Sequence, residues 1–167
     1  AAFATLSAQP DAVLAKAQAE VLAHACGGAG MVGGQQLDMD AESLAATVTT
    51  VALIHRAKTG ILLEAAIRLG ALSGGAGDAA WAKWGGLIGA LFQATDDILD
   101  TTSTTNELGK TAGKDQAVGK ATLVTVLGLE QARSYADDLA QDATQAFADL
   151  KITSHHDVLT DIPNFLL

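Results

Sequence analysis

Three aspartates, Asp96, Asp97 and Asp100, follow one of the most apolar stretches of the sequence, in the segment FQATDDILD at residues 92–100. Residues three and four apart share one face of a helix, so we expect the three carboxylates to project from one sector. Near a helix C-terminus they would oppose the helix dipole and repel one another. Without a cation, each unfavourable neighbour costs on the order of a few tenths of a kcal/mol when exposed.

Magnesium would remove this conflict, because Mg²⁺ takes one or two carboxylates together with waters and substrate phosphate oxygens. Gln93 lies one turn before Asp96 on the same face and could contribute to such a site. The alternative is that the acids end the helix and face solvent. No other charge lies between Lys83 and Asp96, which favours the metal. The spacing therefore predicts a magnesium site at the acidic cluster, which we define as Asp96, Asp97 and Asp100.

Lysines gather after the acidic cluster. Lys110, Lys114 and Lys120 fall within eleven residues of a chain that has only 10 Lys and Arg. Lys110 and Lys120 directly follow glycines, where the backbone can approach an anion closely. Lys114 is equally well explained as a surface lysine. Lys58 and Thr59 offer a further cation and hydroxyl, so the pattern predicts a diphosphate held between magnesium and basic side chains.

Apolar periodicity predicts the helices that must position these groups. We expect helices over residues 11–25, 43–72, 79–100 and 122–150 and a short one around 155–167, with loops at 73–78 and 101–120. The glycines at 27–34 predict a turn or close backbone contacts. Asp40 or Ser43 is expected to cap the second helix, and Asp78 the third. With no strand pattern, residues 1–167 are predicted to form a single all-α domain.

The helix predicted at 79–100 is apolar nearly all round, so it should be buried in the middle of a bundle. Gly85, Gly86 and Gly89 are unfavourable within a helix on propensity alone. We therefore expect them to allow close packing against a neighbouring helix.

Composition excludes several classes of protein. The net charge of −9 argues against nucleic-acid binding. The uncharged stretches are too short, or too rich in Gly and Thr, to span a membrane. Cys26 is the only cysteine, so no intrachain disulfide forms, and it is interpreted as a small buried residue in a reducing compartment. No secretory signal pattern opens the sequence. These features predict a soluble, cytoplasmic protein.

Five ordered segments resemble the C-terminal half of the bacterial short-chain trans-isoprenyl diphosphate synthases, the geranyl, farnesyl and geranylgeranyl diphosphate synthases. They are GGQQLD (33–38), HRAKTG (55–60), FQATDDILD (92–100), LGKTAGKD (108–115) and VGKATL (118–123). The resemblance runs through essentially the whole chain. It implies an antiparallel helix bundle of the isoprenoid synthase type that lacks its N-terminal helices, and a homodimer.

The resemblance also implies roles for individual residues. Asp96, Asp97 and Asp100 would be the family's second aspartate-rich motif, which holds Mg²⁺ against an allylic diphosphate. Diphosphate contacts would come from Lys58, Lys110 and Lys120, while Thr59 and Gln93, with Lys58, would lie near the reacting carbons. Gln35 and Asp38 would support them. Leu123 departs from the pattern, because the family usually has an aromatic residue near this position.

The reaction implied is ionisation of an allylic diphosphate, attack by isopentenyl diphosphate and loss of a proton. The family's first aspartate-rich motif, its residues for isopentenyl diphosphate and its chain-length gate are not in this sequence. We therefore expect this chain to be a C-terminal portion that is inactive alone. A non-catalytic helical partner or regulatory subunit that retains one diphosphate–magnesium site is the alternative. A terpene cyclase of the same architecture is disfavoured by the lysine loop and by DDILD.

Overall fold

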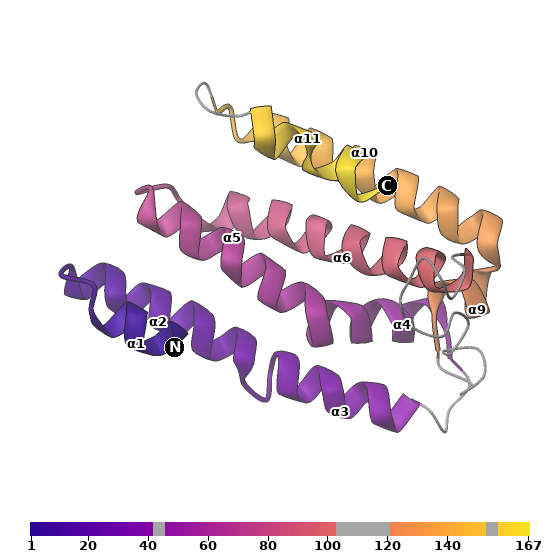
Figure 1. Ribbon diagram of the computed structural model, residues 1–167, viewed down its shortest axis with the longest axis horizontal. Helices are drawn as coiled ribbons and strands as arrows, with labels where there is room; N and C mark the ends of the chain where they lie inside the picture. Colours follow the sequence, from indigo (N-terminus) through magenta and orange to yellow (C-terminus); the bar gives the residue numbers. More distant parts are fainter. Residues whose placement is uncertain (42–45, 103–120, 153–156) are drawn as a thin grey trace.

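The computed structural model describes residues 1–41, 46–102, 121–152 and 157–167 (Figure 1). The elements are α1 (Ala2–Ser7), α2 (Ala12–Cys26), α3 (Met31–Ala41), α4 (Val48–His55), a π-helical turn (Arg56–Gly60), α5 (Ile61–Ser73), α6 (Asp78–Thr102), α9 (Leu123–Leu127), α10 (Leu129–Asp149) and α11 (Asp157–Leu166). These ranges contain no strand, which confirms the all-α prediction. No helix among them is long and apolar enough to cross a membrane.

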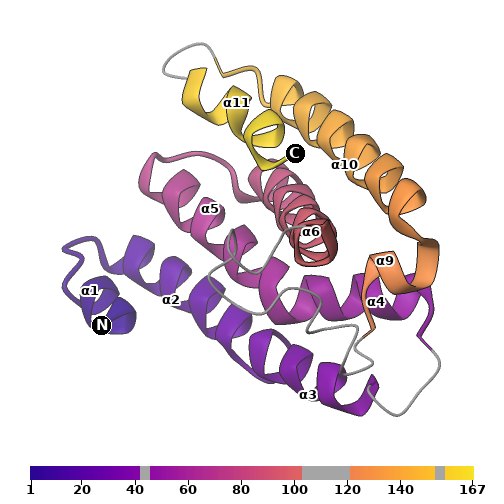
Figure 2. The same ribbon diagram turned by 45° about the vertical axis from the view of Figure 1, so that its right-hand side comes forward.

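Helix α6 lies in the middle of the bundle, between α5 and α10 (Figures 1 and 2). It contributes to two apolar clusters. One, with Leu91 and Ala94, meets α4, α9 and α10. In the other, Trp84 packs on Phe147 with ring centroids 5.1 Å apart. A helix that is apolar on several faces needs partners on each of them, so the predicted buried helix is confirmed.

Two glycines of α6 bring backbones into contact. A Cβ added at Gly89 would lie 2.7 Å from Gly60 Cα, and one at Gly85 would lie 2.9 Å from Glu64 Cα. A Cβ at Gly86 would find its nearest neighbour, the Glu64 Oε2 atom, at 3.7 Å, which is ordinary contact. The close packing predicted for these glycines is therefore correct at Gly85 and Gly89 and wrong at Gly86.

The helix predicted over 43–72 begins at Val48 and runs without a break to Ser73, through α4, the π turn and α5. Its cap also differs from the prediction. Thr47 caps α4, since its hydroxyl accepts the Thr50 N–H at 3.2 Å. Asp40 instead lies inside α3 and accepts a hydrogen bond of 2.8 Å from the Gln36 amide one turn earlier. The prediction for Asp40 is wrong for this reason, and Ser43 lies outside the described residues.

The helix predicted over 122–150 is broken at Gly128. Gly128 adopts φ +82° between α9 and α10, a conformation that favours glycine over residues with a side chain. Thr122 begins α9 in a reciprocal capping box with Thr125. The predicted start at 122 is thus nearly correct, whereas the break at Gly128 is not apparent from apolar periodicity.

Candidate functional site

The acidic cluster lies in the last two turns of α6, beside α4 and α9 (Figure 2). Asp96 is exposed, whereas Asp97 and Asp100 are only 6% and 8% exposed. Gln93, one turn earlier, is half-buried. The outward sector predicted for all three carboxylates is therefore only partly realised, because two of the three are covered by neighbouring segments.

Asp97 points into the bundle. Its Oδ2 atom accepts a hydrogen bond of 2.7 Å from the backbone N–H of Leu123, the first residue of α9. The same oxygen lies 3.4 Å from the Nε2 atom of His55, at the end of α4. One carboxylate thus joins α6, α4 and α9. No role for His55 is predicted from the sequence, because nothing in its spacing indicates that it faces an aspartate 42 positions later in the chain.

Lys58 lies in the π turn that joins α4 to α5. A π turn inserts one extra residue into the helical path, and such turns often occur at functional sites. The Lys58 ammonium donates to Asp38 Oδ2 on α3. The Lys58 and Asp38 side chains are 29% and 17% exposed, so the pair is partly shielded from solvent. Thr59 follows in the same turn and is half-buried.

Helix α3 packs closely on the π turn at Gly34. A Cβ at this position would lie 2.3 Å from the Lys58 backbone nitrogen and 2.4 Å from the Ala57 carbonyl carbon. Only glycine permits this approach without displacing the turn. Gln35, the next residue, is exposed. The glycine pair in GGQQLD indicates a close backbone contact, but the sequence alone does not identify the π turn as the segment that is contacted.

The structure holds two side-chain pairs here, Asp38 with Lys58 and His55 with Asp97, and the backbone from the end of α4 into the π turn joins them. Lys110 and Lys120 lie outside the described residues. The predicted roles of Gln35, Thr59 and Gln93 toward a substrate remain predictions.

Within the described ranges, no group of three or more His, Cys, Asp or Glu side chains is arranged to hold a metal ion. Magnesium does not need such a group, because it is commonly bound by one or two carboxylates and completes its shell with phosphate oxygens and water. The exposed carboxylate of Asp96 fits that chemistry, and Asp100 offers the same hard oxygen donors from a buried position. These residues are therefore compatible with a metal ion that is held jointly with a diphosphate.

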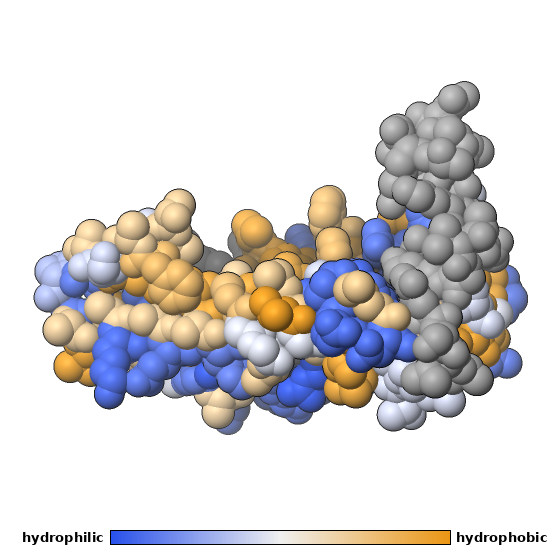
Figure 3. Space-filling model, turned by 90° about the horizontal axis from the view of Figure 1, so that it is seen from below, coloured by the Kyte–Doolittle hydropathy of each residue, from blue (hydrophilic) through white to orange (hydrophobic). Residues whose placement is uncertain are grey.

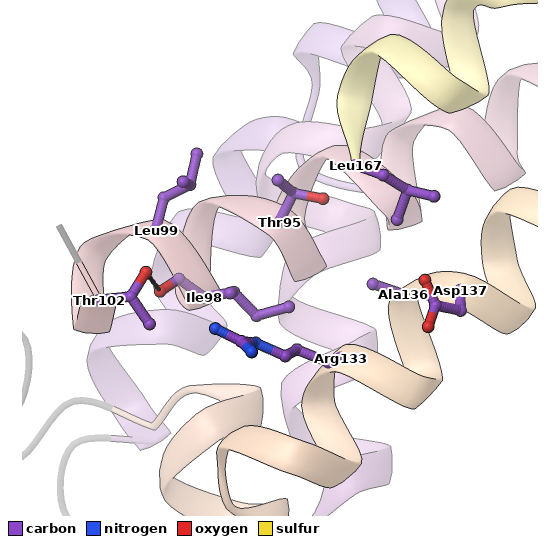
Figure 4. Close-up of a pocket in the computed structure, with 8 residues that line it drawn as sticks. All are labelled: Thr95, Ile98, Leu99, Thr102, Arg133, Ala136, Asp137 and Leu167. Atoms are coloured by element: carbon purple, nitrogen blue, oxygen red, sulfur yellow. Dashed lines mark hydrogen bonds between the residues drawn. The ribbon is translucent and has the colours of Figure 1, made fainter.

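A cavity of about 330 Å³ lies close to the acidic cluster, between α6 and α10 (Figure 4). Thr95, Ile98, Leu99 and Thr102 line it from α6, and the opposite side is formed by Arg133, Ala136, Asp137 and Leu167. None of the three acids lines it. This cavity therefore faces a different side of α6 from the acidic cluster.

Residues 2–155 of the chain match the polyprenyl synthetase family. The chain is 50% identical over 133 residues to farnesyl diphosphate synthase of Escherichia coli (strain K12), which covers 77% of this chain and 44% of the relative. It is 41% identical over 131 residues to dimethylallyltranstransferase of Fischerella ambigua (strain UTEX 1903), which covers 76% of this chain and 38% of the relative.

Among solved structures, the chain is similar to a geranyltransferase from Helicobacter pylori complexed with magnesium and isoprenyl diphosphate. The TM-score is 0.82 at 29% identity, over 98% of this chain and 55% of the other. The chain thus spans about half the length, or less, of these three proteins.

Proposed function

The chain belongs to the polyprenyl synthetase family, and we propose that it is the C-terminal portion of a magnesium-dependent isoprenyl diphosphate synthase. The parent enzyme would condense isopentenyl diphosphate with an allylic diphosphate of the dimethylallyl, geranyl or farnesyl type. The observation that carries this proposal is the connection between the acidic end of α6 and the Lys58 turn through the Asp97–His55 contact. Together with the close packing of Gly89 on Gly60, this contact fixes the acidic ligands relative to a diphosphate-binding cation.

Asp96 and Asp100 are the candidate magnesium ligands in this proposal. Bound there, Mg²⁺ would act as a Lewis acid toward the diphosphate leaving group. Asp97 is also predicted from the sequence to be a ligand, but its Oδ2 atom already contacts the Leu123 amide and His55.

Lys58 would bind a diphosphate oxygen, and Asp38 would hold the ammonium in place until the substrate arrives. Lys110 and Lys120 are proposed as further diphosphate contacts. Thr59 and Gln93 would lie beside the reacting carbons, where oxygen lone pairs stabilise positive charge. The apolar helices would exclude water from the carbocation.

A condensation assay tests the proposal. The complete gene product is incubated with geranyl diphosphate, radiolabelled isopentenyl diphosphate and Mg²⁺, with EDTA as the control. We expect a longer prenyl diphosphate only with Mg²⁺, and no product from the 167-residue chain alone. Tight Mg²⁺-dependent diphosphate binding by the complete protein without condensation would instead support the non-catalytic partner. If the complete protein neither binds the diphosphate nor catalyses condensation, both the synthase and the non-catalytic partner are refuted.

We further propose a homodimer that acts in the cytoplasm. Apolar surface runs in a band beside hydrophilic surface on the face seen from below (Figure 3). The large exposed apolar side chains include Val13, Val32, Leu37, Met39, Leu53, Phe92 and Leu99. Exposed apolar surface of this kind is typical of protein–protein contacts. Cys26 is a free thiol, which is compatible with a reducing compartment. Light scattering of the complete protein should give twice the monomer mass.

A further inference from the structure

Asp97 differs from its neighbour Asp96 in its exposure and in its contacts. Asp96 is exposed, whereas Asp97 is 6% exposed. Its Oδ2 atom accepts the Leu123 N–H at 2.7 Å and lies 3.4 Å from His55 Nε2. An oxygen that already serves a backbone amide and an imidazole is poorly placed to coordinate a metal as well.

The Leu123 amide needs this acceptor. It is in the first turn of α9, where backbone N–H groups have no partner within the helix, and Leu123 is only 1% exposed. A buried N–H that lacks an acceptor is strongly unfavourable. Thr122 caps a different amide, that of Thr125, at 3.1 Å, so Asp97 supplies what the cap does not.

The two contacts of Asp97 connect segments that the proposed site requires. His55 is the last residue of α4 and precedes the π turn that carries Lys58. Asp97 itself directly follows Asp96 on α6. A change at Asp97 would therefore alter the placement of the Lys58 turn relative to Asp96.

We propose that Asp97 is a positioning residue and not a magnesium ligand. It holds the start of α9 and the end of α4 against α6, and so keeps the Lys58 turn aligned with Asp96. This inference rests on the proposed function.

Three variants of the complete protein test it: Asp97→Asn, Asp97→Ala and the matched control Asp96→Asn. The Asn side chain keeps a carbonyl oxygen that can accept the Leu123 N–H, whereas Ala removes it. Asp97→Ala should lower kcat/KM for the allylic diphosphate by about 10- to 100-fold. Asp97→Asn should recover about tenfold or more of that loss, because the acceptor is retained.

The magnesium dependence separates positioning from coordination. The Mg²⁺ concentration for half-maximal activity should rise about tenfold or more in Asp96→Asn, and should stay within about threefold of the unaltered protein in Asp97→Asn. The inference would be overturned if the Mg²⁺ concentration for half-maximal activity rose as much in Asp97→Asn as in Asp96→Asn. Asp97→Ala with unaltered kinetics would also overturn it.

Hydrogen exchange at the Leu123 amide gives a readout that does not depend on the reaction. Exchange should accelerate in Asp97→Ala and remain slow in Asp97→Asn, while the Leu91 amide in the middle of α6 serves as the internal reference. If Asp96→Asn leaves the magnesium dependence unchanged, the proposed metal site fails, and the Leu123 exchange rates alone decide whether Asp97 positions α9. If Asp97→Ala does not fold, fast Leu123 exchange in Asp97→Asn counts against the inference and slow exchange supports it.

Discussion

The two ends of α6 both carry aspartates, but the electrostatic surroundings of these aspartates are opposite. Asp78 begins the helix, where negative charge is favourable toward the helix dipole. Arg68 of α5 clamps it with two hydrogen bonds, from Nε at 2.7 Å and from Nη2 at 2.6 Å. Glu64 accepts a third bond from the same guanidinium at 3.2 Å.

This clamp shifts both ionisation equilibria in the direction that stabilises the charged pair. The hydrogen bonds from Arg68 hold the pKa of Asp78 below its ordinary value, and they outweigh the opposing effect of burial. The hydrogen bond to Asp78 likewise raises the pKa of Arg68. The first turn of α6 is therefore an arrangement that stabilises the fold.

At the other end of α6, three aspartates face the negative end of the helix dipole. Among the described residues, no Lys or Arg forms a salt bridge with Asp96. Asp97 is held by a histidine and a backbone amide. The two ends show that aspartates at the unfavourable end of a helix dipole indicate function better than aspartates at the favourable end. Selection for stability alone would not place them there.

The largest difference between the two ends should appear in catalysis. We expect Asp96→Asn combined with Asp100→Asn to lower kcat about 100- to 1000-fold in the complete protein, because magnesium contributes several kcal/mol to stabilising charge in the transition state. Asp78→Asn should retain nearly all activity. Steady-state assays at saturating Mg²⁺ check this, and equal losses at both ends would contradict the functional distinction.

The middle of α6 provides a prediction about packing alone. Gly89→Ala should destabilise the fold by about 1–3 kcal/mol, since its Cβ would meet the Gly60 backbone. Gly86→Ala is the matched control, because the nearest atom is a flexible Glu64 oxygen at 3.7 Å. It should stabilise the helix by up to about 1 kcal/mol. Urea unfolding measures both, and equal effects of the two changes would show that the π turn and α6 are not in close contact at Gly89.

The start of α6 should contribute to stability in a pH-dependent way. Asp78→Asn should cost about 1 kcal/mol at pH 7, a value reduced for the partial exposure of the pair. Because the pKa of folded Asp78 lies below its unfolded value of about 3.9, this contribution is fully present above that value. It is lost as the pH falls through the folded pKa.

The unfolding free energies of the unaltered protein and of Asp78→Asn should therefore differ by a constant amount above about pH 5 and converge below about pH 4. Denaturant titrations across this range check the sign. A difference that grows on acidification would exclude the clamp.

The smallest effect should be a gain of stability at the acidic end. Without Mg²⁺, Asp96→Asn should stabilise the fold by on the order of a few tenths of a kcal/mol, because it removes one charge from the unfavourable end of the helix dipole. Thermal unfolding in EDTA measures the gain. A loss of stability there would mean that Asp96 has a structural partner.

Much of the bundle was predictable because local physics dictates it. The buried nature of α6 follows from its apolar faces, and the start of α9 follows from Thr122. The interruptions were not predictable. The π turn at Lys58 packs against Gly34 of α3 and Gly89 of α6, and apolar periodicity continues through this turn and through the break at Gly128.

The sequence by itself determined that this is a helical member of its family, and it identified the acidic cluster and Lys58 by residue type and spacing. Only the tertiary structure decided how these residues are used. Spacing along one helix states which side chains share a face, but it cannot state what covers that face. Helix α9 and His55 approach Asp97 from distant parts of the chain, and their contacts bury Asp97 while the adjacent Asp96 stays exposed.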